Sequence, residues 1–248
     1  MPYLDQLNPP QKEAVLHQTG PLLVIAGAGA GKTRTIAYRI LHLIESGIKP
    51  ENILAITFTN KAAREMRERV QKLLGADLSA PMMTTFHSFG VYVLRHRGEK
   101  IGLPHHFTIL DRDDSVAKIK EAMRVLSIDE KRFEPRKILN AISRQKGDNV
   151  NQAQFQEDNG QEFYGKVISQ VWQKYEELLK TTKSLDFDDL LLKTVELFKT
   201  NPDILANFQD RFRYLHVDEY QDTNVVQYEL TNLLAQKYQN ICVVGDMD

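Results

Sequence analysis

Five short apolar runs divide the chain, and each is followed by a turn or by a helical pattern. They are Leu22–Ala26, Ile53–Phe58, Met82–Phe86, Tyr214–Val217 and Ile241–Val244. Apolar runs of this length that end at turn signals are typical of strands buried on both faces. Strands buried on both faces belong mostly to parallel sheets covered by helices. The pattern therefore predicts a central parallel sheet.

Helical patterns separate the first three runs. Residues 32–45 and residues 61–74 each place apolar side chains on one face at a spacing of three to four residues. Gly47 and Gly75 follow these two stretches as stop signals. Alternation of strand and helix predicts an α/β fold.

The middle of the chain has a different pattern. From about residue 90 to residue 183 the sequence shows no convincing buried strand, and residues 111–126 and 161–180 have helical periodicity. Residues 145–160 are rich in Asn, Gln, Asp and Gly, which predicts a mobile loop. We expect a helical subdomain inserted into the α/β domain. The predicted division is 1–88 for the first half of the α/β domain, 89–183 for the insertion and 184–248 for the second half.

Composition adds few constraints. The chain is 42% hydrophobic and 26% charged, with a net charge of −1, so no overall basic field indicates a polyanion or membrane partner. A locally basic groove remains compatible with this balance. Cys242 lies within an apolar run, which predicts a buried strand residue rather than a reactive thiol. No leader or membrane-length apolar run is evident, so we expect a cytoplasmic protein without a membrane partner.

A glycine-rich stretch follows the first run and carries the clearest chemistry. It reads Ala26, Gly27, Ala28, Gly29, Ala30, Gly31, Lys32, Thr33. Strand, glycine-rich turn and helix opened by Gly-Lys-Thr form a phosphate-binding loop, in which backbone N–H groups surround the anion. Lys32 would reach the β- and γ-phosphates of ATP, and Thr33 would ligate Mg²⁺. The usual pattern has glycine where Ala26 stands, which is tolerable if this position needs a small side chain rather than a positive φ.

Two acids follow the fourth run. Asp218 and Glu219 stand where an ATPase places one carboxylate on Mg²⁺ and a neighbouring one on the attacking water. We assign Asp218 to the metal and Glu219 to the water. Taken alone, the pair is equally compatible with an acidic junction between strand and loop.

These stretches and several others resemble, in order, the motifs of the UvrD/Rep/PcrA family of superfamily 1 DNA helicases. The matching stretches are Leu7–Gln11 for the Q motif, Ala26–Thr35 for motif I, Thr57–Ala63 for motif Ia, Thr85–Phe89 for motif Ib, Leu185–Leu190 for the acidic motif before motif II, Asp218–Asn224 for motif II and Val244–Asp248 for the start of motif III. The resemblance covers essentially the whole chain. It implies a RecA-like P-loop NTPase domain, called 1A, that is interrupted by a helical domain, called 1B.

The resemblance also implies binding roles. Gln11 would read the adenine edge, and Arg34 and Gln221 would lie beside the nucleotide. Single-stranded DNA, and its junction with duplex DNA, would be bound through five residues at or just after the ends of the second and third runs. They are Phe58, Asn60, Lys61, Thr85 and His87.

Simpler readings of these residues remain open. Phe58 can be a core residue that covers the end of a strand, and Lys61 a solvated residue of a first helical turn. His87 can be a partly buried histidine with satisfied nitrogens. Asp186 and Asp189 can form an acidic helix cap instead of acting at the DNA or nucleotide site.

The function implied by the resemblance is that of the ATP-binding half of a 3′-to-5′ DNA helicase that translocates on single-stranded DNA. The match to motif III stops at Asp248, so we expect a piece of a longer protein whose second RecA-like domain is its missing partner. By itself the chain would bind nucleotide with little turnover. The alternatives are the motor subunit of a helicase–nuclease of the RecB or AddA kind, a nucleotide-gated DNA-binding module, and a small-molecule kinase.

Overall fold

Five parallel strands form the central sheet of the structure, a computed structural model that describes residues 2–27, 29–75 and 79–246. In spatial order they are β1 (Leu22–Ile25), β7 (Ile241–Gly245), β6 (Tyr214–Val217), β2 (Ile53–Thr57) and β3 (Met82–Thr85). All neighbouring strands pair in parallel. The α/β prediction is therefore confirmed, and each apolar run became a strand whose ends moved by no more than one residue.

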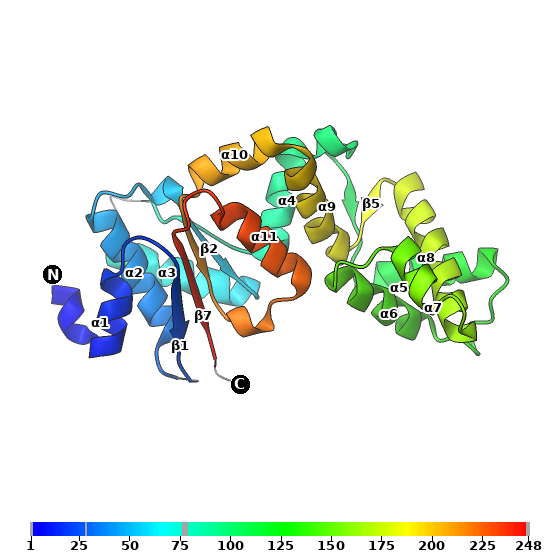
Figure 1. The fold of residues 1–248 in the computed structure, drawn as a ribbon, viewed down its shortest axis with the longest axis horizontal. Coiled ribbons are helices and arrows are strands. Elements are labelled where there is room, and N and C mark those ends of the chain that lie inside the picture. Colours follow the sequence, from blue (N-terminus) through cyan, green and yellow to red (C-terminus); the bar gives the residue numbers. More distant parts are fainter. Residues whose placement is uncertain (1, 28, 76–78, 247–248) are drawn as a thin grey trace. The chain divides into compact units, whose positions relative to one another are not determined.

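The chain forms two compact units (Figure 1). The sheet unit contains residues 1–89, 201–223 and 230–248, and the helical unit contains residues 90–200 and 224–229. The sequence placed the return from the insertion at residue 184. In the structure residues 184–200 belong to the helical unit, because α9 (Phe187–Thr200) packs on α6 (Pro135–Gly147). The helix α11 (Val225–Ala235) begins in the helical unit and ends in the sheet unit.

Helices cover both faces of the sheet. The apolar sides of α2 (Lys32–Glu45) and α3 (Asn60–Leu74) pack on one face, where they meet Ala55, Cys242 and Val244. The second half of α11 lies on the opposite side in Figure 1. The remaining elements of this unit are η1 (Pro2–Gln6), α1 (Pro9–Leu16), η2 (Pro50–Asn52), the start of α4 (Phe86–Arg97), α10 (Pro202–Arg211) and η4 (Tyr220–Asp222). Cys242 is buried, as the apolar run predicted.

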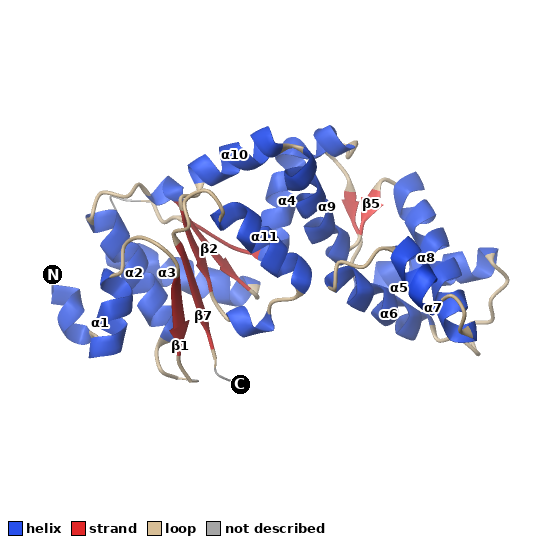
Figure 2. Cartoon of the chain, viewed as in Figure 1, coloured by secondary structure: helices blue, strands red, loops and turns tan. Residues whose placement is uncertain are grey.

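The second unit is almost entirely helical (Figure 2). Besides α6, α9 and parts of α4 and α11, it contains η3 (Gly98–Ile101), β4 (Thr108–Ile109), α5 (Arg112–Val125), α7 (Gln152–Asn159), α8 (Phe163–Thr181) and β5 (Ser184–Leu185). Its core forms around Trp172 and Tyr175 of α8, against apolar residues of α5 and α6. Within the described ranges, no helix is both long enough and apolar enough to cross a bilayer.

One expectation for this unit was wrong. Residues 145–160 are not one loop: α6 continues to Gly147, and α7 begins after Asn151. Asn151 accepts a hydrogen bond from the Gln154 N–H, and the Gln154 side chain accepts one from the Asn151 N–H, which is a capping box. The polar residues that indicated a loop therefore start a helix. The unit also contains the short strands β4 and β5, which pair in parallel. The residues of β4 are exposed or half-buried, and β5 begins at residue 184, so neither is a buried strand between residues 90 and 183.

One polar side chain lies deep in the sheet. The His216 imidazole is 2% exposed within β6, and neither ring nitrogen has a hydrogen-bond partner in the part of the chain that the structure describes. Burial and, to a lesser extent, the charge of Arg39 lower the pKa of His216 well below its usual range. The folded protein therefore keeps this ring neutral at a pH where an unfolded chain protonates it.

We expect this histidine to make the protein sensitive to acid. Because the pKa is lower in the folded state, the stability is intact above about pH 6.5 and falls as the pH decreases from there, by at most about 1.4 kcal/mol per pH unit. His216→Phe should remove this part of the slope, and replacement of the exposed His106 should leave it unchanged. Urea denaturation between pH 7.5 and 5.5 measures the difference. Equal slopes in the His216→Phe variant and the unchanged protein would contradict the expectation.

Candidate functional site

The loops that follow β1, β7 and β6 meet at one edge of the sheet. These three strands are neighbours and run parallel, so their carboxyl ends lie together. Lys32 and Thr33 follow β1, Asp218 and Glu219 follow β6, and Asp246 follows β7. Open α/β sheets bind ligands at this edge.

The glycine-rich loop has the conformation that its glycines allow. Gly29 and Gly31 have φ values of +77° and +85°, which side chains with a Cβ rarely adopt. Gly31 is the N-cap of α2 and has no side chain to bind the first N–H groups of the helix, which leaves these donors for an anion. Ala26 is not among the residues of positive φ, and its N–H donates to the Gly245 carbonyl at 3.1 Å. Ala28 lies outside the described residues.

Lys32 is a buried cation that faces two carboxylates. Its Nζ forms an ion pair with Asp246 and lies 3.9 Å from Glu219 Oε2. The bond to Asp246 is the main cause that raises the pKa of Lys32 above its usual value. The ammonium is therefore charged at neutral pH, and these carboxylates hold it where phosphate oxygens would compete for it. The sequence did not single out Asp246 as a partner of Lys32.

Thr33 and Asp218 bring two oxygen ligands together. Thr33 Oγ1 lies 3.4 Å from Asp218 Oδ2. Burial, followed by the charge of Glu219, raises the pKa of the Asp218 carboxyl, so a nearby cation would stabilise its ionised form. No group of three or more His, Cys, Asp or Glu in the described ranges is arranged to hold a metal ion. Mg²⁺ commonly takes one or two protein oxygens and completes its shell with phosphates and water, so this pair fits Mg²⁺.

Gln221 connects the second acid to the loop after β7. Its Nε2 donates to Glu219 Oε2 at 3.0 Å, and its Oε1 accepts from the Asp246 N–H at 3.1 Å. Glu219 itself has a left-handed backbone, with φ 52° and ψ 44°, which is uncommon for a residue other than glycine. A Cβ at Gly245 would lie 2.7 Å from Gln221 Oε1, so a larger residue there would displace the Gln221 side chain. Direct contact of Gln221 with nucleotide stays a prediction.

Gln11 and Arg34 flank the glycine-rich loop. Gln11 forms a capping box with Asn8 at the start of α1, and its Nε2 donates to the Ala30 carbonyl at 2.9 Å. Arg34 donates to the Gln6 carbonyl at 2.8 Å. The helix start at Asn8 and the placement of Gln11 beside the loop thus occur together, and adenine recognition stays a prediction.

The expected DNA-binding residues lie at or just after the carboxyl ends of β2 and β3, at the same edge of the sheet. Asn60 and Lys61 are exposed, and Lys61 lies 3.8 Å from Glu65. The half-buried Phe58 ring packs edge-on against Phe86, with 5.6 Å between the ring centroids. Phe58 can therefore support the fold and still present part of its ring to a base.

Thr85 and His87 are less accessible than these residues. The buried Thr85 hydroxyl donates to Ser88 Oγ at 2.9 Å and accepts from the Ser88 N–H at 3.2 Å, which caps the first turn of α4. His87 is half-buried, and burial lowers the pKa of its imidazole. The structure gives Thr85 a local role, and DNA contacts of both residues stay predictions.

The helical unit contains a buried ion cluster that the sequence did not reveal. Lys146 Nζ lies 2.8 Å from Asp189 Oδ1, 2.9 Å from Asp186 Oδ2 and 2.8 Å from Glu176 Oε1. Tyr175 donates to the same Asp186 oxygen at 3.0 Å. Asp186 also accepts from the Asp189 N–H at 2.8 Å, which is the helix cap that was one of the two open readings. No local pattern could have joined Lys146, placed in an expected loop, to acids about forty residues away.

Comparisons with known proteins agree with this arrangement. A family model described as the UvrD/REP helicase N-terminal domain matches residues 7–248. The chain is 46% identical over 246 residues to an ATP-dependent DNA helicase PcrA of Staphylococcus aureus strain Mu50, which covers 99% of this chain and 34% of the relative. It is also 46% identical over 243 residues to an ATP-dependent DNA helicase PcrA of Staphylococcus epidermidis strain ATCC 12228, which covers 98% of this chain and 33% of the relative. The chain spans about a third of the length of the curated relatives it matches.

Proposed function

Because the chain belongs to the UvrD/REP helicase N-terminal domain family, we propose that it supplies the ATP-binding part of an ATP-dependent DNA helicase that moves 3′-to-5′ on single-stranded DNA. The observation that carries the proposal is the convergence of Lys32, Thr33, Asp218 and Glu219 at one sheet edge. The exposed Asn60 and Lys61 lie at the same edge, where DNA can respond to the nucleotide.

The nucleotide half of the mechanism uses the phosphate loop and the two acids. The N–H groups of the loop and of the first turn of α2 would hold the β- and γ-phosphates, and Lys32 would exchange Asp246 for phosphate oxygens. Thr33 and Asp218 would hold Mg²⁺, which neutralises charge that develops on the phosphates when it is bound. Glu219 would orient the attacking water and accept its proton.

The DNA half uses contacts that tolerate any base. Phe58 would stack on a base, and Asn60, Lys61 and His87 would contact the backbone. We propose single-stranded DNA and its junction with duplex DNA as the partners.

For these 248 residues alone we propose nucleotide binding with little turnover. The resemblance assigns the arginines that reach the γ-phosphate to a second RecA-like domain. Such an arginine accelerates hydrolysis by about 10³–10⁵ in related enzymes. The relatives are about three times as long as this chain, which leaves room for that domain.

The function is tested by binding of MgATP and of a labelled oligothymidylate, the latter with and without a non-hydrolysable ATP analogue. We expect both ligands to bind and the analogue to change the DNA affinity. A DNA affinity that does not respond to the analogue would favour a simple DNA-binding module. Phosphoryl transfer to a small acceptor would indicate a kinase. Failure to bind ATP would overturn the proposal.

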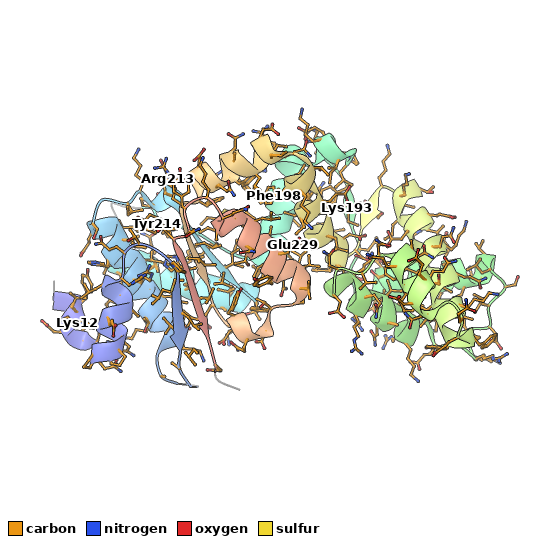
Figure 3. The ribbon with its side chains drawn as sticks, viewed as in Figure 1. Lys12, Lys193, Phe198, Arg213, Tyr214 and Glu229 are labelled. Carbon is orange, nitrogen blue, oxygen red and sulfur yellow. The ribbon has the colours of Figure 1, made fainter. Side chains whose placement is uncertain are left out.

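Replacing Phe58 by alanine tests the DNA half. We expect the affinity for oligothymidylate to fall by about 1–3 kcal/mol, the contribution of one base stack, with unchanged affinity for MgATP. Tyr214→Ala is the matched control, because Tyr214 is also a half-buried aromatic residue. It stands at the amino end of β6, whereas Phe58 lies at the carboxyl ends of the strands (Figure 3). Fluorescence anisotropy of the labelled DNA gives the DNA affinity of both variants. If Phe58→Ala lowers thermal stability as Tyr214→Ala does but leaves DNA affinity intact, Phe58 is a core residue only.

A further inference from the structure

One stripe of α2 holds the N-terminal segment of the chain. Arg34, Tyr38 and His42 stand four residues apart, so they lie on one face of the helix, on successive turns. The segment that they hold is η1, whose residues come just before the capping box of Gln11.

Each residue of the stripe contacts η1. Arg34 donates to the Gln6 backbone carbonyl at 2.8 Å, and the Tyr38 hydroxyl donates to Gln6 Oε1, also at 2.8 Å. The Tyr3 ring stacks on Tyr38 with 5.8 Å between centroids and 23° between planes. The Tyr3 hydroxyl lies 3.1 Å from His42 Nδ1. Two successive turns of α2 thus hold both the backbone and the side chain of Gln6.

Tyr38 is central to these contacts. It is 8% exposed, touches Tyr3 and Gln6, and lies below the Arg34 guanidinium, whose carbon is 5.4 Å from the ring centroid. A cation over an aromatic face is attracted to it, so the ring helps to hold Arg34 as well.

The held segment leads directly to Gln11. Leu7 alone separates Gln6 from Asn8, the cap that exchanges two hydrogen bonds with Gln11. The Gln11 side chain then reaches Ala30 of the phosphate loop, and a Cβ at Gly31 would lie only 3.0 Å from its Nε2. The same helix therefore carries Lys32 in its first turn and the stripe that holds the segment leading to Gln11.

We propose that Tyr38 is a positioning residue for base recognition, acting through Gln6 on Arg34 and on the chain that carries Gln11. The proposal rests on the proposed nucleotide-binding function. Tyr38 would not touch the nucleotide. It would fix the distance between Lys32, which would contact the phosphates, and the groups that would contact the base. Discrimination between bases requires donors and acceptors held in place, and ordering them in advance lowers the entropic cost of binding.

The test is Tyr38→Phe, which removes the bond to Gln6 and keeps the stacked ring. Affinities for MgATP, MgGTP and inorganic tripolyphosphate are measured by calorimetry. We expect the affinity for ATP to fall about threefold or more and those for GTP and tripolyphosphate to stay unchanged, so that the preference for ATP over GTP narrows. Gln6→Ala should give the same result, and the double variant should add nothing, because both changes remove one interaction.

Tyr238→Phe is the control. Its hydroxyl donates to Asp210 at 2.6 Å in the same unit but away from this stripe, so its loss should leave all three affinities unchanged. Gln6 is exposed, so Gln6→Ala keeps the test valid even if Tyr38→Phe disturbs folding.

The outcomes separate the two proposals. An unchanged ratio of ATP to GTP affinity in both variants, with normal ATP binding by the unchanged chain, would overturn the role of Tyr38 alone. An equal loss for ATP and tripolyphosphate would also overturn it, since it would show a general disturbance of the loop. If the unchanged chain bound tripolyphosphate but no ATP, or neither, the proposed function would fail together with this inference.

Discussion

Replacing Lys32 by alanine is expected to lower the affinity for MgATP by roughly 100-fold or more, the largest effect on binding that we predict. Each hydrogen bond to a charged group contributes about 1.5–3 kcal/mol, and the ammonium is placed to meet more than one phosphate oxygen. The bond to Asp246 and the charges of the neighbouring carboxylates outweigh its burial and raise the pKa of Lys32, so the ammonium stays charged at neutral pH. The variant also leaves Asp246 and Glu219 without their cation, so two carboxylates would then repel the phosphates.

Calorimetric titration with MgATP measures this effect. Lys49→Ala is the matched control, because Lys49 is exposed and precedes β2, at the edge of the sheet opposite to the site. We expect its affinity to equal that of the unchanged chain. The thermal midpoint of each variant shows whether the fold is kept. An affinity of folded Lys32→Ala within about threefold of the unchanged chain would contradict the assignment of this loop.

Replacing Lys146 by methionine is expected to cost about 3–5 kcal/mol of unfolding free energy, the largest effect on stability that we predict. Methionine keeps much of the volume but leaves three carboxylates without their common cation, and removing one partner of a buried ion pair has this cost. Burial by itself would lower the pKa of Lys146, but the charges of Asp189, Asp186 and Glu176 outweigh it and raise this pKa well above its usual value. The ammonium therefore stays charged in the folded protein.

The carboxylates give the variant a characteristic dependence on pH. Burial raises the pKa of Asp189 even with Lys146 present. Without the cation the pKa of Asp189 should rise further. A raised pKa means that stability is lost as the pH increases through the window between the unfolded and the folded values. The deficit of Lys146→Met should therefore shrink on acidification from pH 7 towards pH 5.

Urea denaturation followed by tryptophan fluorescence measures this prediction. Trp172 is the only tryptophan of the chain, and its indole donates to Glu176 Oε1 at 3.0 Å, so the signal comes from beside the cluster. Lys174→Met is the control, because Lys174 forms a surface pair with Glu177 at 2.9 Å, and such pairs contribute about 0–1 kcal/mol. A loss below about 1 kcal/mol for Lys146→Met would show that the cluster does not stabilise the unit.

Local sequence patterns located helices and strands best where the residues that form the pattern are close together in the sequence. Each strand could be located from its own apolar residues, because a buried parallel strand is apolar at nearly every position. Helix α2 has the predicted bounds for a similar reason, since its start at Lys32 and its stop after Glu45 are marked by neighbouring glycines. The same kind of reasoning failed at residues 145–160, where Asn151 and Gln154 are polar because they cap α7.

The sequence by itself determined the α/β class and the placement of the glycine-rich loop at Gly31–Lys32 beside the acids after β6. It could do so because parallel strands bring their carboxyl ends to one edge. Only the tertiary structure decided which polar and charged groups pair: Lys32 with Asp246, Lys146 with three acids, and the α2 stripe with Gln6. Such contacts join residues far apart in the chain and depend on the burial of polar side chains. Neither the long separation nor this burial leaves a periodic signal in the sequence.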